Sequence, residues 1–227
     1  MTDIELQALQ LSLSVATRSV LFSLPSAIFI AWLLTQRFIG RIVLDTLVHL
    51  PLVLPPVVIG YLLLLTFGTH GVIGQWLYHY FGIRLPFTRN GAALATAVMS
   101  FPLMVRTIRI SLDGVDHGLI DAARTLGANR IDRFFSIILP LIVPGIIAGA
   151  VTAFAASLGE FGAVITFAGN VSGETQTLAL ALYSAMQLPN GEQLSQHLAV
   201  VAIVLGVMGL LFAEWLARLS RRWITHQ

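Results

Sequence analysis

The 227-residue chain contains no cysteine and no lysine, since all 13 of its basic side chains are arginine. Without cysteine it has neither a disulfide framework nor a thiolate metal site. Without lysine it cannot hold the phosphate-binding loop G-x-x-x-x-G-K-[ST], whose lysine reaches the β- and γ-phosphates of a nucleotide. Any energy that this protein uses must therefore come from an ion gradient or from another subunit.

Charge is scarce as well. Only 11% of the residues are charged, 56% are hydrophobic and the mean hydropathy is +0.84. Soluble domains carry about 25% charged residues, so a small soluble core is excluded and an integral membrane protein is indicated. Asp3 and Glu5 precede the first apolar run, and no basic segment suggests a cleaved signal peptide. No repeat or second soluble domain is visible, so residues 1–227 are predicted to form a single transmembrane domain.

The apolar runs predict an all-α membrane protein with about five transmembrane helices, because about 20 helical residues cross a hydrocarbon core of about 30 Å. The predicted spans cover about residues 11–36, 46–67, 91–110, 139–168 and 198–216. Residues 68–90 and 169–196 are predicted loops, and residues 111–140 form a charged loop. Prolines within the first three spans are expected to bend or break helices, either around a gated cavity or as in ordinary spans; they are Pro25, Pro51, Pro55, Pro56 and Pro102.

Arginine predicts the orientation. Ten of the 13 arginines fall on one side: Arg37, Arg41, Arg106, Arg109, Arg124, Arg130, Arg133, Arg218, Arg221 and Arg222. The opposite side has Arg84 and Arg89, and Arg18 lies within the first span. The positive-inside rule therefore predicts a cytoplasmic charged loop, a cytoplasmic C-terminus and an external N-terminus.

The charged loop predicts a short amphipathic helix. Nine of the 24 charged side chains lie between Arg106 and Pro140. Asp116 suits the N-cap, Gly127 suits the left-handed position that ends a helix, and the small Ala122 and Ala123 allow close approach of another surface. An apolar face is formed by Leu119, Ile120, Ala123 and Leu126, and a second amphipathic turn by Ile131, Phe134, Phe135 and Ile138. Periodicity alone leaves two interpretations open, a helix pair resting on lipid and a docking surface for another protein.

The segment D-A-A-R-T-L-G-A-N-R-I-D-R-F-F-S-I-I-L-P, residues 121–140, resembles the E-A-A-x-x-x-G-(x9)-I-x-L-P loop of permease subunits in bacterial binding-protein-dependent ABC importers. Asp121 replaces the usual glutamate and keeps its charge. Residues 49–64, 99–106 and 157–170 are similar to molybdate permeases, so the resemblance covers nearly the whole chain. Permeases for sulfate and tungstate share much of this sequence.

The resemblance implies a permease of the type I ABC importer fold, embedded in the lipid of the bacterial inner membrane. It implies a homodimer with two cytoplasmic ATPase subunits and a periplasmic oxyanion-binding protein, and no nucleic acid. ATP and Mg²⁺ would be held by the ATPases, so this chain would bind no cofactor and would not itself be an enzyme. The loop would be a coupling helix that docks on the ATPase, through Leu119, Asp121, Ala122, Ala123, Leu126, Gly127, Ile137, Leu139 and Pro140.

Residues along the translocation pathway carry a weaker signal. An oxyanion that must be released is best served by neutral donors, which makes Ser100, Thr152 and Ser157 candidates; such hydroxyls also commonly bond to their own helix. Glu160 is the one acid within an apolar run, so a pathway or gate role is one interpretation. Because a carboxylate repels an anion, a structural acid at a bend is the other. The histidines show no metal-ligand spacing, and no Ser-His-Asp set is recognisable.

Two other classes of protein remain to be compared with the importer permease. An ion-coupled secondary transporter usually has inverted repeats and intramembrane charge relays, whereas only Glu160 and Arg18 qualify here. A passive channel or scaffold would not need the coupling pattern. The sequence therefore predicts an importer permease for an oxyanion, molybdate first, with sulfate and tungstate as alternatives.

Overall fold

The computed structural model describes residues 3–224, with the side chains of these residues except His117, Leu210, Ala213, Glu214 and residues 217–224. In this range the chain is helical, without a strand. The elements are α1 (Asp3–Thr35), α2 (Arg41–Val53), α3 (Pro56–Phe67), α4 (Val72–Phe81), α5 (Arg89–Asp113), α6 (His117–Thr125), α7 (Arg130–Arg133), the π-helix η1 (Phe134–Ile138), α8 (Leu139–Leu158), α9 (Gly162–Phe167), α10 (Leu178–Met186) and α11 (Glu192–Ile224).

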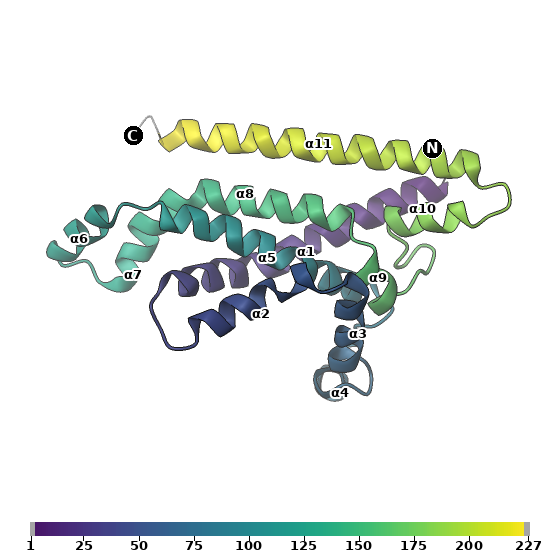
Figure 1. The fold of residues 1–227 in the computed structure, drawn as a ribbon, viewed down its shortest axis with the longest axis horizontal. Coiled ribbons are helices and arrows are strands. Elements are labelled where there is room, and N and C mark those ends of the chain that lie inside the picture. Colours follow the sequence, from purple (N-terminus) through teal and green to yellow (C-terminus); the bar gives the residue numbers. More distant parts are fainter. Residues whose placement is uncertain (1–2, 225–227) are drawn as a thin grey trace.

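Helices α1, α5 and α8 form the centre of the bundle, where α5 packs against both of the others (Figure 1). Their contact surfaces are rich in small side chains. Lipid provides no hydrophobic driving force for helices to associate, so membrane helices are held together by close backbone packing, which small side chains allow. Fully or nearly fully buried alanines include Ala16, Ala27, Ala31, Ala92, Ala95 and Ala153. Helix α11 packs along α8 and α10 on the outside.

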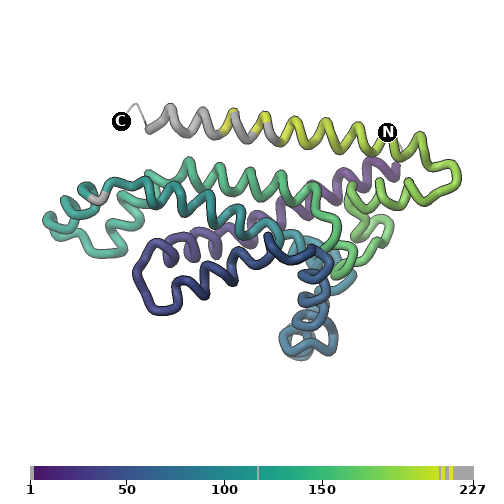
Figure 2. Tube along the Cα trace, in the orientation of Figure 1, coloured from purple at the N-terminus to yellow at the C-terminus, as the bar shows by residue number. Residues whose placement is uncertain are grey.

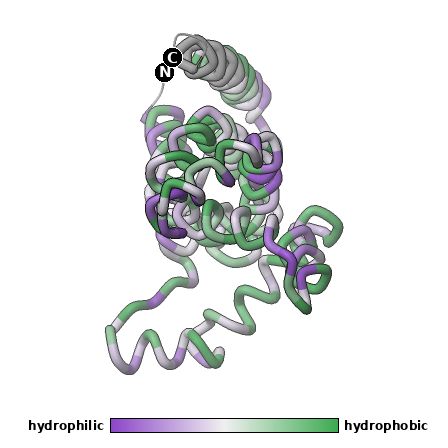
Figure 3. The backbone as a smooth tube through the Cα atoms, turned by 90° about the vertical axis from the view of Figure 1, so that its left-hand side faces the viewer, coloured by the Kyte–Doolittle hydropathy of each residue, from purple (hydrophilic) through white to green (hydrophobic). Residues whose placement is uncertain are grey.

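Four helical segments within the described residues are long and apolar enough to cross a membrane. They are α1, α5, the continuous stretch Arg130–Leu158 and the segment Glu192–Gly209 of α11, and the bent pair α2–α3 is a fifth if it counts as one broken span. Many large hydrophobic side chains are exposed on the helices, among them Phe22 at 78%, Ile42 at 81% and Leu211 at 66%, as expected of a protein surrounded by lipid. Figure 3 shows hydrophobic residues along every part of the chain drawn in colour. The predicted all-α membrane fold is therefore confirmed.

The second predicted span, residues 46–67, is not a single straight helix. Helices α2 and α3 meet at an angle of 118°. Pro55 and Pro56 have no N–H groups, and Leu54 before them is extended with φ −77° and ψ 145°, the conformation that a following proline favours. The other prolines singled out in the sequence, Pro25, Pro51 and Pro102, stay inside α1, α2 and α5, so only the proline pair breaks a helix.

The fourth predicted span, residues 139–168, differs at both ends from the helix in the structure. The helix begins earlier, at Arg130, and runs through η1 into α8. It ends at Leu158, and α9 starts after a break at residues 159–161. Hydrophobic residues lie on both sides of this break, and the single acid within it, Glu160, was not enough for hydropathy to locate it.

The two predicted loops each contain a helix. Residues 68–90 hold α4, which leaves the bundle at its side (Figure 1). Residues 169–196 hold α10, whose Leu178, Ala181 and Ala185 are buried. The N–H of Leu178 donates to the Oγ of Ser12 in α1 at 2.7 Å, so a side chain distant in sequence caps α10.

The two ends of the bundle differ in what they carry. In the orientation of Figures 1 and 2, the N-terminal end of α1 and α10 lie on the right, whereas α6, α7 and the α1–α2 connection lie on the left. Helix α11 runs from the right toward the left. The predicted orientation also rests on Arg218, Arg221 and Arg222. The side chains of these three arginines are not among those that the structure describes.

Candidate functional site

Helix α6 begins and ends at the residues that its sequence predicts. The carboxylate of Asp116 accepts the N–H of Gly118 at 2.8 Å, which is an N-cap. At the other end Gly127 has φ +87°. The N–H of Ala128 donates to the carbonyl of Ala123 at 3.0 Å, and that of Gly127 to Arg124 at 3.1 Å. This pair of bonds is the Schellman motif, which satisfies the last carbonyls of the helix.

The segment from α6 to η1 is attached to the bundle by apolar side chains. Val115 is buried, and it shares one hydrophobic cluster with Leu112 and Ile142, against which Ile120 packs. On the far side the rings of Trp32 and Phe134 meet edge to face at 6.1 Å. Ile120 thus links α6 to a cluster that includes residues of α5 and α8, and Phe134 links η1 to α1.

Pro140 accounts for the π-helix that joins α7 to α8. The ring of a proline inside a helix clashes with the carbonyl four residues earlier and removes one N–H donor. Here the N–H of Leu139 bonds to the carbonyl of Phe134, five residues back, so the turn widens just before the proline. Ile137 and Leu139 are half-buried and Pro140 is exposed. The I-x-L-P pattern thus marks a widened turn at the entry to α8.

Some of the predicted coupling residues are exposed to the outside, and others are buried or half-buried within the chain. Leu119 is 49% exposed, Leu126 is 88% exposed, and Asp121, Ala122 and Gly127 are exposed as well. Ala123, predicted to contact another subunit, is instead buried within the chain at 9%. The exposed side chains of α6 and its C-terminal end, Leu119, Asp121, Ala122, Leu126 and Gly127, are called the coupling surface below.

Two further apolar side chains are exposed at the same end of the molecule. Ile131 is 69% exposed and Phe135 is 61% exposed. The second amphipathic turn contains both, but its periodicity did not separate them from the half-buried Phe134 and Ile138. An Asn129–Asp132 capping box also starts α7, with two N–H groups donating to the Asn129 side chain. Its N-x-x-D spacing was a readable signal for this second helix start.

The pathway candidates do not converge on one site. Thr152 is exposed on α8 and donates to the Ala148 carbonyl at 2.8 Å, and Ser100 is buried and lies 3.4 Å from the Ala97 carbonyl. Ser157 is buried, and its Oγ lies 3.4 Å from that of Ser19 in α1. The first two hydroxyls bond to their own helix and the third joins two helices. No group of residues with the geometry of a metal site occurs among the described residues.

Glu160 lies in the break between α8 and α9. Its Oε1 accepts the N–H of Ala163 at 2.9 Å, and its side chain is half-buried. This bond satisfies a donor at the start of α9, which supports the structural interpretation of this acid at a bend.

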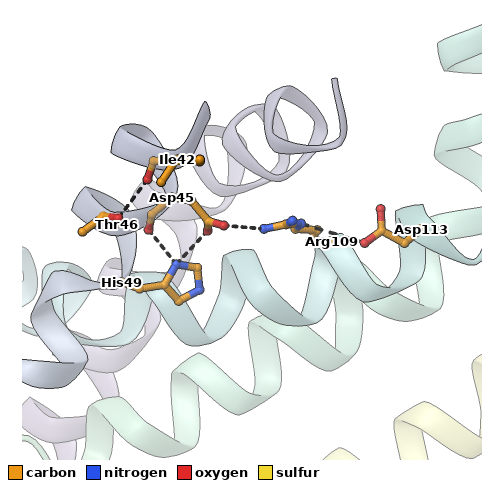
Figure 4. Close-up of polar contacts among 6 residues, drawn as sticks. All are labelled: Ile42, Asp45, Thr46, His49, Arg109 and Asp113. Carbon is orange, nitrogen blue, oxygen red and sulfur yellow. Dashed lines mark hydrogen bonds and ion pairs between the residues drawn. The ribbon is translucent and has the colours of Figure 1, made fainter. Parts of the chain in front are cut away.

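Sequence reasoning missed a polar cluster between α2 and α5 (Figure 4). The Nη1 of Arg109 lies 3.0 Å from the Oδ2 of Asp45 and its Nε 3.8 Å from the Oδ2 of Asp113. The Nδ1 of His49 lies 3.1 Å from the Oδ1 of Asp45. The signal was present as two pairs at the helical spacing i, i+4. A cavity of about 580 Å³ opens beside them.

An apolar cavity of about 790 Å³ lies further along, between α1, α2 and α5. At its edge the Nη1 of Arg18 donates to the Oδ1 of Asn90 at 2.9 Å. Arg18 is therefore held by the start of α5.

A bundle of membrane-crossing helices with one exposed, doubly capped helix at its end is the arrangement that the sequence predicts for the membrane subunit of a transporter. The chain belongs to the family described as "Binding-protein-dependent transport system inner membrane component", whose pattern matches residues 23–225. The predicted resemblance to importer permeases is thus confirmed.

Relatives of the chain include proteins named for molybdenum transport and proteins named for sulfate transport. The chain is 57% identical to the "Molybdenum transport system permease protein ModB" of Escherichia coli K12 over 97% of each chain. It is 53% identical to the protein of that name from Haemophilus influenzae over 94% of each chain. The "Sulfate transport system permease protein CysT" of Salmonella typhimurium is 39% identical over 79% of this chain and 65% of its own.

Solved structures share the fold at low sequence identity. A chain of a bacterial alginate ABC transporter in complex with a pentasaccharide-bound periplasmic protein has a TM-score of 0.76 at 20% identity, over 96% of this chain and 80% of that one. A chain of the MetNI methionine ABC transporter in inward-facing conformations has a TM-score of 0.73 at 15% identity, over 97% and 99%. These likenesses establish the type I importer permease fold.

Proposed function

We propose that this chain is the permease subunit of an ATP-driven importer that carries molybdate across the bacterial inner membrane. One observation carries the choice of anion, the 57% identity over 97% of both chains to a molybdenum transport permease. The sulfate relative is less similar and matches a smaller share of either chain. Sulfate and tungstate are therefore the competing substrates that an experiment must separate from molybdate.

The assembly proposed here contains two copies of this chain, two cytoplasmic ATPase subunits and a periplasmic oxyanion-binding protein. The ATPases would supply the ATP and Mg²⁺ sites, because a chain without lysine cannot build the phosphate-binding loop. The coupling surface and the C-terminus would face the cytoplasm and the N-terminus the periplasm. The arginine distribution supports this orientation.

In the proposed mechanism, the ATPases draw together on ATP and carry α6 with them. Val115 and Ile120 tie α6 to the cluster that α5 and α8 share, so the spans would move as rigid bodies between inward-open and outward-open states. Leu119 and Leu126 would enter a groove of the ATPase, and Asp121 would help to set the register. Along the pathway, Ser100, Thr152, Ser157 and Glu160 remain the candidates.

The experiment that tests this function is uptake of labelled molybdate by the complex reconstituted in vesicles, with unlabelled tungstate and sulfate as competitors. Uptake should require ATP and should stop when the ATPase loses its phosphate-binding lysine. Excess sulfate should compete weakly. Uptake that survives the loss of that lysine would exclude the importer, and stronger competition by sulfate than by unlabelled molybdate would exclude the proposed substrate.

Docking is tested with Leu126→Ser. Leu126 is 88% exposed, so the change leaves the fold intact, and it removes an apolar anchor whose burial contributes about 1.5–3 kcal/mol. The affinity for the ATPase should fall by about one to two orders of magnitude, measured by co-purification over a concentration series. Val72→Ser on α4, 86% exposed, is the matched control and should bind normally. Equal binding by both variants would contradict docking at the coupling surface.

A further inference from the structure

Helix α2 is joined to α5 by an ion pair that lies outside the coupling surface (Figure 4). The guanidinium of Arg109 and the carboxylate of Asp45 are 3.0 Å apart, and their side chains are 23% and 35% exposed. His49 lies one turn further along α2, and its Nδ1 is 3.1 Å from Oδ1, the other oxygen of the Asp45 carboxylate. Among the described residues, the only other ion pair between different helices joins Glu5 of α1 to His197 of α11, at the opposite end of the bundle.

Helix α2 has little else to hold it. Of its 13 residues only Val48 and Pro51 are buried. Ile42 and Val53 are each 81% exposed. It is flanked by Gly40, with φ +97°, at one end and by the proline break at the other. Helix α2 is therefore fixed to α5 by the Asp45–Arg109 pair together with the packing of Leu44 and Val48 in the cluster that α5 and α8 share.

Arg109 lies close to the end of α5, where a movement of the coupling helix α6 would be passed to α5. It is one helical turn from Asp113, the last residue of α5, and α6 begins after a connection of three residues. Leu112 and Val115, on either side of the end of α5, are buried in the cluster that holds the coupling segment. A displacement of α6 would therefore act on the C-terminal turn of α5, Arg109–Asp113, through the short connection and the buried Leu112 and Val115.

The other end of α2 leads through the proline bend to α3, of which Ile59, Gly60 and Leu63 are buried. After the bend, α3 packs against α9 so closely that a Cβ on Gly60 would lie 2.6 Å from the Cβ of Thr166. Only Leu54 and Pro55 separate α2 from α3, so a displacement of α2 would be passed to α3 and, through the α3–α9 contact, to the helix that follows Glu160.

We propose that the Asp45–Arg109 ion pair is a transmission contact, through which the movement of the coupling helix and α5 is passed to α2 and α3. This inference rests on the proposed importer function. Asp45 and Arg109 are positioning residues, and they need not touch the transported anion. An anion site at the same cluster is disfavoured, because Asp45 and Asp113 line the cavity together with its arginines.

The experiment uses the whole reconstituted complex, and its readout is the amount of molybdate imported per ATP hydrolysed. Asp45→Asn and Arg109→Gln should assemble and hydrolyse ATP in response to loaded binding protein. Their import per ATP should fall by about tenfold, the lower part of the usual range for coupling between sites. The exchange D45R/R109D should raise the ratio again when it is combined with Asp113→Asn, which avoids two carboxylates one turn apart on α5. Arg106→Gln is the matched control, since Arg106 is exposed on α5, lines the same cavity and takes no part in the described ion pairs.

A crosslink provides a second, independent measurement. The chain has no cysteine, so Asp45→Cys with Arg109→Cys can be bridged by a short bis-maleimide in an otherwise unreactive background. If α2 and α5 move together, the bridged complex should import more per ATP than the same variant before bridging. Import blocked by the bridge would overturn the proposal, and so would wild-type ratios in both single variants. Failure of the wild-type complex to import would instead refute the importer function itself.

Discussion

At the scale of single residues, Gly127 shows why the loop pattern contains a glycine. A Cβ there would meet nothing within 4 Å, but φ is +87°. The requirement is therefore conformational and not steric, because other residues lose about 1–2 kcal/mol in the left-handed region. Local chemistry of this kind is readable in a sequence, and for that reason both Asp116 and Gly127 were predicted correctly as the ends of α6.

The left-handed conformation of Gly127 predicts how substitutions at this position will rank. Gly127→Val should destabilise the end of α6 by about 1–2 kcal/mol and reduce ATP-driven uptake. Gly127→Asn should lose much less, since asparagine tolerates the left-handed conformation. Uptake by membranes with equal amounts of each variant is the measurement. Equal activity of the valine and asparagine variants would show that the left-handed turn is not required.

Ala123 marks the limit of prediction at this scale. Its position on the apolar face of α6 was read correctly, but that face is divided between the chain itself and the outside. Ala123 and Ile120 turn inward, whereas Leu119 and Leu126 are exposed. Periodicity identifies a face of a helix, and only the packing of α6 against α5 and α8 decides which side chains remain available to a partner. The Asp45–Arg109 pair was missed for a related reason, since 64 residues separate its members.

At the scale of elements, hydropathy identified where apolar helices occur, but not where they break. The Pro55–Pro56 pair lies inside an apolar run, and the Gly159–Phe161 break has hydrophobic residues on both sides of the single acid Glu160. Composition cannot distinguish one long span from two short helices at 118°. The proline signal was present, but four of the nine prolines in the chain lie inside helices, so proline alone does not locate a break. Contacts between distant segments, such as α3 with α9, decide the outcome.

The α3–α9 contact predicts a strong effect of side-chain size. Gly60→Val should force the two helices apart, because a Cβ at Gly60 would also lie 2.8 Å from the carbonyl oxygen of Ala163. Overpacking of this kind typically costs about 1–3 kcal/mol, so the melting temperature of the detergent-solubilised protein should fall. Gly206→Val on α11 is the control, since a Cβ there meets nothing within 4 Å. If the two variants have the same melting temperature, the α3–α9 contact is not close in the folded protein.

At the scale of the whole molecule, arginines and exposed connections separate toward two ends. The α1–α2 turn lies at the same end as α6 and α7, and α10 lies at the other (Figure 1). If the long axis of the bundle crosses the membrane, the turn that contains Arg37 and the segment that contains Arg124 and Arg130 share one face. The positive-inside rule then assigns that face to the cytoplasm.

The absence of cysteine makes this orientation directly testable. Single cysteines can be placed at exposed positions of both ends, Ile39 and Arg130 at one and Ser172 and Asn190 at the other. A membrane-impermeant maleimide should label Ile39→Cys and Arg130→Cys only in inside-out vesicles, and Ser172→Cys and Asn190→Cys only in spheroplasts. The unaltered chain should take up no label on either side. The reverse pattern would place the coupling surface in the periplasm, where no ATP-driven partner could reach it, and would refute the proposed importer together with its orientation.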